Sequence, residues 1–183
     1  MEQLFNQLSE TLLNNLNAGE HLKVAIGGEN SQFVRFSQSK VRQSGLVDDA
    51  SLSIVLIKDD RTCSGSFTLT GNIDIDEATA MEEMNRLRTE VGTLPKDPFV
   101  VMPEDTGSSQ EEHNGSLLND EEAVSALSPA MQGVDLAGIW ASGRIFSGNA
   151  NSAGQKHWFA TDTYSLDYSL ITPDERMVKG TFA

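Results

Sequence analysis

Apolar and polar side chains alternate strictly over two neighbouring segments of this chain. Every second side chain is apolar in residues 51–57, and the same two-residue period returns in residues 62–70, where Gly65 is part of the pattern. Successive side chains of a strand point to opposite faces, so both segments are predicted strands with one apolar face and one hydroxyl-rich face. The joint from Lys58 to Arg61 predicts a hairpin. We expect the rest of the chain to pack on this sheet.

Helical periodicity flanks the predicted sheet. Apolar residues recur at three- and four-residue spacing from Leu4 to Leu16 and predict an amphipathic helix. A second helix is expected to begin at Asp74 or Asp76. Its predicted buried stripe consists of Ala78, Met81, Met84, Leu87 and Val91. Short strands are predicted for residues 22–26, closed by a turn at Gly27-Gly28, and for residues 99–102.

The second half of the chain alternates between polar and aromatic stretches. Residues 104–120 are nearly all small, polar or acidic, which predicts a flexible acidic loop. Residues 123–131 follow as a helix that Ser128-Pro129 restarts. Residues 136–183 are aromatic and interrupted by turn signals at 147–149, 151–154 and 172–174, which predicts a meander of about four strands.

These patterns predict an α+β fold, with an antiparallel β-sheet covered by helices on one side and followed by a β-meander. The expected division is an N-terminal α/β domain over residues 1–103, the flexible loop over 104–120, and a helix plus β-meander over 121–183. A chain of 183 residues can bury a hydrophobic core in either one domain or two small ones.

Charge and composition narrow the classes of function. The 13 basic and 27 acidic side chains give a formal net charge of -14, so direct nucleic-acid binding is not expected. No Lys or Arg lies between Lys96 and Arg144, which indicates a solubilising acidic stretch or a surface for a cationic partner. No apolar run is long enough to span a bilayer, the first residues do not resemble a signal peptide, and Cys63 is the single cysteine. A cytoplasmic protein is therefore expected.

Few residues point to catalysis. His21, His113 and His157 are dispersed and no HExxH-like helix occurs, so no metal site is predicted in this chain. Cys63 is interpreted as a buried structural thiol. The glycines at 27, 28 and 143 are interpreted as turns rather than as nucleotide-binding loops. Asn114-Gly115-Ser116 matches a glycosylation acceptor, which carries no weight without an export signal. The residues alone define no catalytic centre.

Two regions of the chain resemble the TldD/PmbA family, also known as modulators of DNA gyrase. The first comprises Phe33-Val34-Arg35-Phe36 and Ser39-Lys40-Val41-Arg42-Gln43, followed by the hairpin and the helix that ends before Pro98. The second comprises residues 136–143, a glycine-bearing strand, and residues 149–154, with an Asn-Ser-x-Gly turn. The resemblance covers nearly the whole chain.

The resemblance implies an N-terminal substrate-channel and assembly domain of a zinc metallopeptidase that acts on unfolded or modified peptides. The family's HExxxH motif lies in a C-terminal catalytic domain that this sequence does not contain. Zinc is therefore expected only in that domain of a metal-bearing subunit, and this chain alone is expected to be inactive. The expected partners are an extended peptide substrate and a TldD- or PmbA-type subunit in a homo- or heterodimer, with neither nucleic acid nor membrane.

Four polar residues are candidates for substrate binding. Arg35 and Gln43 are expected to line the channel, whereas Asn151 and Ser152 either contribute contacts or only shape a turn with Gly154. Two alternatives remain open. The chain could be a non-enzymatic peptide-binding or adaptor module that captures extended segments at its strand edges, or a purely structural oligomerisation domain.

Overall fold

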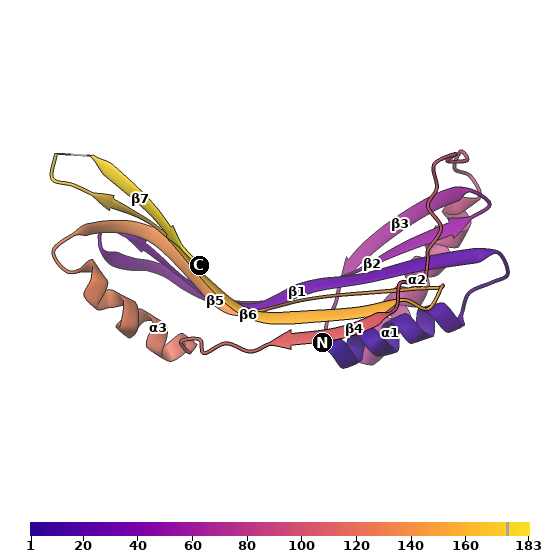
Figure 1. Cartoon of the computed structure of the whole chain (residues 1–183), viewed down its shortest axis with the longest axis horizontal. Coiled ribbons are helices and arrows are strands. Elements are labelled where there is room, and N and C mark those ends of the chain that lie inside the picture. Colours follow the sequence, from indigo (N-terminus) through magenta and orange to yellow (C-terminus); the bar gives the residue numbers. More distant parts are fainter. Residues whose placement is uncertain (175) are drawn as a thin grey trace. The chain divides into compact units, whose positions relative to one another are not determined.

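The computed structural model describes residues 1–174 and 176–183, without the side chains of residues 120 and 121. Within these residues the helices are α1 (Glu2–Asn14), α2 (Ile73–Val91) and α3 (Asp120–Leu127), with a 3-10 helix η1 (Ser128–Met131). The strands are β1 (Glu20–Ser37), β2 (Lys40–Lys58), β3 (Arg61–Thr68), β4 (Ser108–His113), β5 (Asp135–Asn151), β6 (Lys156–Ile171) and β7 (Met177–Phe182) (Figure 1).

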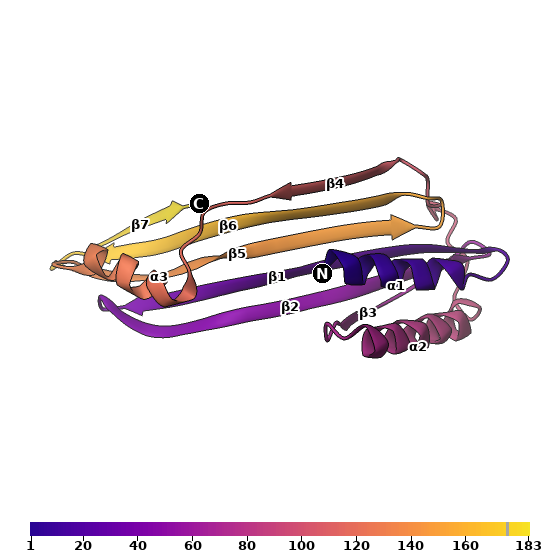
Figure 2. The same cartoon turned by 90° about the horizontal axis from the view of Figure 1, so that it is seen from below.

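All seven described strands belong to one antiparallel sheet. Its order is β3-β2-β1-β5-β6-β4, and β7 also pairs with β6 (Figure 2). The predicted α+β class is confirmed. The C-terminal meander has three strands rather than about four, and it belongs to the same sheet because β5 pairs with β1. The predicted turn at residues 147–149 lies inside β5.

Contacts divide the chain into two compact units. Unit 1 comprises Met1–Gly28, Asp49–Glu111 and Phe146–Phe159, and unit 2 comprises Glu29–Asp48, Glu112–Ile145 and Ala160–Ala183. Each unit collects three separate stretches because β1, β2, β5 and β6 each contribute residues to both. The units therefore do not coincide with the consecutive segments 1–103, 104–120 and 121–183.

The core of unit 1 follows the predicted periodicities. The alternating side chains of Leu52, Ile54 and Leu56 are fully buried, together with Phe5, Leu8 and Leu12 of α1 and with Met84, Leu87 and Val91 of α2. The helix α2 contacts both α1 and β3. Its stripe differs from the prediction at the N-terminal end, where Ala78 is exposed, Met81 is half-buried, and Asp76 and Ala80 are buried instead.

The start of α2 differs from the prediction. Asn72, rather than Asp74 or Asp76, is the N-cap residue, and its side-chain oxygen accepts from the backbone N–H groups of Asp74 and Ile75. Asp76 turns back to accept hydrogen bonds from the N–H and hydroxyl groups of Thr70, at 2.8 and 2.9 Å. These bonds satisfy a carboxylate that is only 1% exposed.

Two tight hairpins use the left-handed backbone region. The predicted β2–β3 hairpin is confirmed, with Asp59 and Asp60 at φ 50° and 60°, and Lys58 pairs with Arg61. The β1–β2 hairpin was not predicted, and its central residues Gln38 and Ser39 have φ 53° and 54°. Positive φ at both central residues gives the turn a twist that matches right-handed strands.

Several predicted loops and strands are wrong. Gly27 and Gly28 lie within β1, and Gly143 lies within β5, so none of them forms a turn. Residues 99–102 form no strand, and Phe99 is 85% exposed. The segment 104–120, predicted to be a loop, contains β4 in its middle. β4 forms without any apolar pattern because it pairs with the edge of β6.

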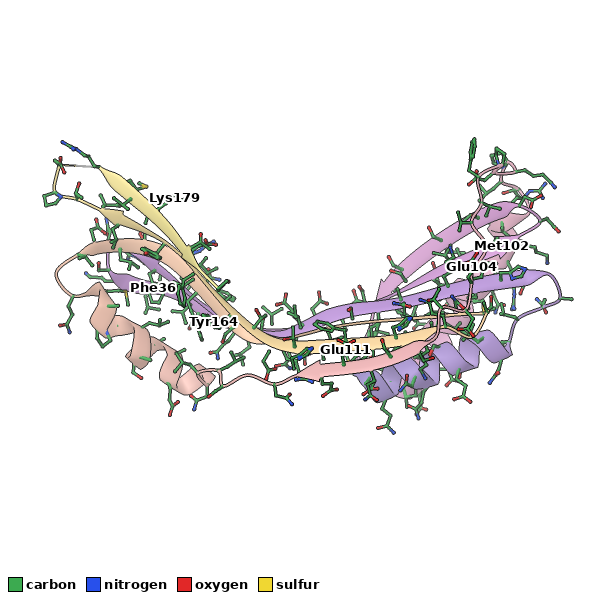
Figure 3. The ribbon with its side chains drawn as sticks, viewed as in Figure 1. Phe36, Met102, Glu104, Glu111, Tyr164 and Lys179 are labelled. Carbon is green, nitrogen blue, oxygen red and sulfur yellow. The ribbon has the colours of Figure 1, made fainter. Side chains whose placement is uncertain are left out.

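The core of unit 2 lies between the sheet and α3. Val34 and Phe36 of β1 pack with Leu136 and Trp140 of β5, and with Ala123 and Met131 of the predicted helix region. Phe36 is labelled in Figure 3. The region is helical as predicted, with α3 continuing into η1 at Ser128-Pro129. No described helix of either unit is both long and apolar enough to cross a bilayer.

A candidate polar binding site

Arg35 and Gln43 lie on neighbouring strands of unit 2. Arg35 is exposed between the buried Val34 and Phe36, so it points away from the core of this unit. A Cβ at Gly45 of β2 would meet the ring of Phe33 of β1 at 2.9 Å, which places these two residues on one face. Arg35 and Gln43 are both exposed, on adjacent strands of the same sheet. The structure therefore leaves both side chains accessible to solvent.

Asn151 and Ser152 shape the turn between β5 and β6 in unit 1. The Asn151 side-chain oxygen accepts from the N–H groups of Ala153 and Gln155, at 2.8 and 3.3 Å, and its amide donates to the Glu104 carbonyl at 2.9 Å. The backbone N–H of Ser152 donates to the carbonyl of Leu22 in β1 at 2.9 Å, and the backbone N–H of Leu22 donates to the Ser152 hydroxyl at 3.0 Å. These side chains bind the chain itself. They belong to a different unit from Arg35 and Gln43.

A pocket of about 490 Å³ lies beside this turn, within unit 1. The segment that carries Met102 and Glu104 forms one wall (Figure 3), and Lys23, Asn149 and Asn151 line the strands beneath. The Lys23 ammonium donates to the carbonyl of Val101 at 3.1 Å. The amide of Asn151 and the ammonium of Lys23 therefore bind the wall of this pocket, and their role there is structural.

A second pocket, of about 390 Å³, lies in unit 2 and is here called the polar pocket. It is lined by Asn30, Ser31 and Gln32 of β1, Leu46 of β2, Ser142, Gly143 and Arg144 of β5, and Leu117 and Asn119. The Gln32 amide donates to the carbonyl of Leu118 at 2.8 Å and so fixes the segment that forms one wall. Carboxamides and hydroxyls predominate, and such groups suit a neutral hydrogen-bonding ligand.

Gly143 allows β1 and β5 to approach closely under the polar pocket. A Cβ at this position would meet the Asn30 carbonyl oxygen and the Ser31 Cα, each at 2.4 Å. Only glycine fits such a contact without a backbone shift. The glycine that the sequence analysis interpreted as a turn is therefore required by strand packing.

Arg144 balances charge at the edge of the polar pocket. Its guanidinium donates to Glu112 at 2.8 Å, to Asp162 at 3.2 Å and to the side-chain oxygen of Asn114 at 2.9 Å. Two carboxylates thus surround one cation, which leaves little attraction for an anionic ligand. These bonds tie residues 112–114 to β5 and β6.

Ser142 offers an unused hydrogen-bonding group to the polar pocket. The residue is 3% exposed, and within residues 1–174 and 176–183 its buried hydroxyl oxygen has no hydrogen-bond partner. A buried hydroxyl without a partner is costly, so a water molecule or a ligand group that reaches it is favoured. This hydroxyl makes the polar pocket the better candidate of the two for ligand binding.

Cys63 is buried, as predicted, at 8% exposure. Burial raises the pKa of its thiol, and a hydrogen bond to the Glu90 carboxylate at 3.5 Å acts in the same direction. A raised pKa disfavours the thiolate, which is the nucleophilic form. The residue therefore lacks the environment of a catalytic cysteine.

Unit 1 contains His21 and His157, and unit 2 contains His113. His157 shares a hydrogen bond with Ser109 at 2.8 Å, and His113 ends β4. No group of three His, Cys, Asp or Glu side chains with metal-binding geometry occurs in the described part of the chain. The residues present do not form the ligand set that a zinc peptidase requires.

The long-stranded antiparallel sheet with helices in both units is a fold found in known structures. It matches a candidate modulator of DNA gyrase from Thermotoga maritima MSB8 with a TM-score of 0.66 and 15% identity. TldE from Thermococcus kodakarensis matches with a TM-score of 0.64 and 11% identity. A candidate modulator of DNA gyrase from Bacteroides thetaiotaomicron VPI-5482 matches with a TM-score of 0.60 and 17% identity.

Each of these matches covers 99% of this chain but only 42 to 44% of the solved structure. The chain therefore spans less than half the length of these proteins. No family model and no curated protein matches the sequence. The resemblance predicted from the sequence is confirmed at the level of the fold.

The sequence analysis missed most of the polar pocket. Ser142 and Gly143 lay within the motif that carried the resemblance, but no role was assigned to them in binding. Arg144 was visible only as the first basic residue after a long acidic stretch. No signal in the sequence pointed to Asn30 or Gln32, because polar residues on a strand normally indicate a solvent-exposed face.

Proposed function

We propose that this chain is a substrate-handling and assembly domain of a TldD/PmbA-type metallopeptidase that acts on unfolded or modified peptides. The observation that carries the proposal is the shared fold with TldE over 99% of the chain. In this proposal a region outside this sequence supplies the zinc and the chemistry, since the described residues contain no metal-binding cluster. The natural partner would be a TldD- or PmbA-type subunit.

Two surfaces of unit 2 support peptide handling. Arg35 and Gln43 are exposed polar residues on adjacent strands, and carboxamides and hydroxyls line the polar pocket. Unfolded peptides expose main-chain amides and carbonyls, and such polar side chains can hydrogen-bond to these groups without selecting a sequence. A broad substrate range is expected from binding of this kind.

Hydrogen exchange tests the proposal. Reduced and carbamidomethylated ribonuclease serves as an unfolded, basic polypeptide, and the native enzyme is the folded control. Amides of unit 2 should gain protection with the unfolded form only. Arg35→Ala combined with Gln43→Ala should weaken binding. The matched control is Arg176→Ala, which removes an exposed arginine of the same unit whose ion pair is with Asp174. Equal protection by both forms of ribonuclease would contradict the proposal.

Strand addition is a second candidate because β2 has an open edge. β3 pairs with residues 51–58 of β2, and Leu69 bonds to Ala50, so in the described part of the chain residues 40–49 pair on one side only. Ala50 directs its carbonyl toward β3, and the carbonyl of Asp49 lies against Gly28 of β1, so Asp48 directs its backbone groups outward. An extended peptide can add to such an edge.

A proline substitution separates the two modes of binding. Asp48→Pro removes an outward N–H group but leaves the pairing with β1, so the chain should still fold. Capture by the strand edge predicts that this variant loses the unfolded ribonuclease, while Asp48→Ala retains it. If both variants bind alike, the edge is not the binding surface, and the side-chain surfaces of unit 2 remain.

A further inference from the structure

The dipeptide Asn114-Gly115 is held between two charged side chains of unit 2. Arg144 donates from its guanidinium to the side-chain oxygen of Asn114 at 2.9 Å. The backbone N–H of Gly115 donates to a carboxylate oxygen of Asp162 at 2.9 Å. Both residues of the dipeptide are exposed, so water reaches them. A cation thus contacts the side-chain carbonyl, and an anion contacts the neighbouring amide.

This arrangement matches the needs of one intramolecular reaction. The Gly115 nitrogen can attack the side-chain carbonyl carbon of Asn114 and close a five-membered ring. Attack requires loss of the N–H proton, which Asp162 is placed to accept as a general base. It also places negative charge on the Asn114 oxygen, which Arg144 is placed to stabilise. Glycine adds no Cβ to obstruct the approach.

We propose that Asn114 is a site of self-catalysed deamidation in the folded protein. A bond forms between the Gly115 nitrogen and the Asn114 side-chain carbon, and the bond from that carbon to the amide nitrogen breaks. The proton taken from Gly115 passes through Asp162 to the leaving nitrogen, which departs as ammonia. Water then opens the cyclic imide and leaves an aspartate or isoaspartate at position 114. No oxidant or reductant is required.

The product changes the charge around Arg144. Glu112 and Asp162 already pair with this arginine, and deamidation adds a third carboxylate beside them. An aspartate at position 114 competes with Glu112 and Asp162 for the single guanidinium, so the bonds from Arg144 to these two residues weaken. The segment that follows position 114 forms a wall of the polar pocket. The modification is therefore expected to loosen that wall.

Mass spectrometry of the full chain, incubated at neutral pH and then digested, tests this inference. The peptide containing Asn114 should acquire the mass of an amide-to-acid conversion about tenfold faster in the folded chain than in urea. Asp162→Asn and Arg144→Lys should each bring the folded rate down to the rate in urea. The matched control is Asp167→Asn, which changes another β6 carboxylate, bonded to Thr181, and should leave the rate unchanged.

The comparison between folded and urea-unfolded wild type decides the matter even if a variant does not fold. A folded rate equal to or below the unfolded rate would overturn the proposal. The proposal would also be overturned if the Asp162→Asn variant is folded, as judged by circular dichroism, and still deamidates at the wild-type rate. The inference is independent of peptide handling, because the reaction needs neither a peptide substrate nor a partner.

Discussion

At the scale of single residues, Glu20 shows how a buried charge is kept in unit 1. Its side chain is 1% exposed and accepts hydrogen bonds from Arg88 and Asn17, while Lys58 lies 3.6 Å away. Burial by itself raises the pKa of this carboxyl, but the hydrogen bonds from Arg88 and Asn17 outweigh burial and lower the pKa to about 2. The carboxylate links the start of β1 to α2 and β2.

Glu20→Gln should therefore destabilise the protein in a pH-dependent way. The folded pKa lies below the ordinary glutamate value of 4.5, so the carboxylate stabilises the fold above that value and loses this contribution as pH falls toward 2. We expect the variant to lose about 3 kcal/mol at neutral pH and much less near pH 2. Urea unfolding of both proteins across this range measures the difference. A pH-independent difference would contradict this account of Glu20.

Two adjacent glycines of β1 should respond oppositely to alanine. A Cβ at Gly28 would lie 2.3 Å from the Asp49 carbonyl oxygen and 2.6 Å from the Phe146 ring, whereas a Cβ at Gly27 meets nothing within 4 Å. Gly28→Ala should cost about 2 kcal/mol or more through overpacking. Gly27→Ala should be neutral or slightly stabilising. Thermal unfolding of the two variants measures this, and equal losses would contradict the packing argument for Gly28.

At the scale of elements, β4 shows that a strand can form without an apolar pattern. All six of its residues are exposed, and its sequence is Ser-Ser-Gln-Glu-Glu-His. Alternate backbone groups of β4 pair with β6, and the others face outward at the edge of the sheet. The polar composition that predicted a loop therefore describes only the side chains and not the backbone.

Limited proteolysis distinguishes β4 from its flanks. The first cleavage by a protease specific for glutamate should follow Glu104, which lies outside any strand, rather than Glu111 or Glu112 within β4. Paired strands resist proteolysis because cleavage requires local opening. Mass spectrometry of early fragments identifies the site. Preferential cleavage within residues 108–113 would mean that β4 does not form a stable pair with β6.

At the scale of the whole molecule, the dispersed histidines limit what the chain can bind. His21 and His157 belong to unit 1 and His113 to unit 2, and the single cysteine is buried with a raised pKa. The purified chain should therefore hold no stoichiometric zinc. Elemental analysis after dialysis measures the metal content. One tightly held zinc ion per chain would contradict this expectation and place metal chemistry within this sequence.

Local periodicity determined the elements whose stability comes from one apolar face. The stripe of α1, the alternation that forms β2 and β3, and the C-terminal part of the α2 stripe could all be predicted from neighbouring residues, because burial of one face decides the structure. The motifs shared with the TldD/PmbA family also indicated the correct fold. The boundaries of these elements differed from prediction mainly at glycines and at polar segments.

Only the tertiary structure showed which glycines are required by strand packing and which polar residues line a pocket. Gly28 and Gly143 lie where a neighbouring strand approaches too closely to leave room for a Cβ atom. No local sequence pattern indicates such a contact. The polar pocket joins residues 30–32, 46, 117, 119 and 142–144, which are distant in sequence and individually resemble ordinary solvent-exposed positions. Strand pairing places them together, because hydrogen bonds between distant backbone segments fix which side chains become neighbours.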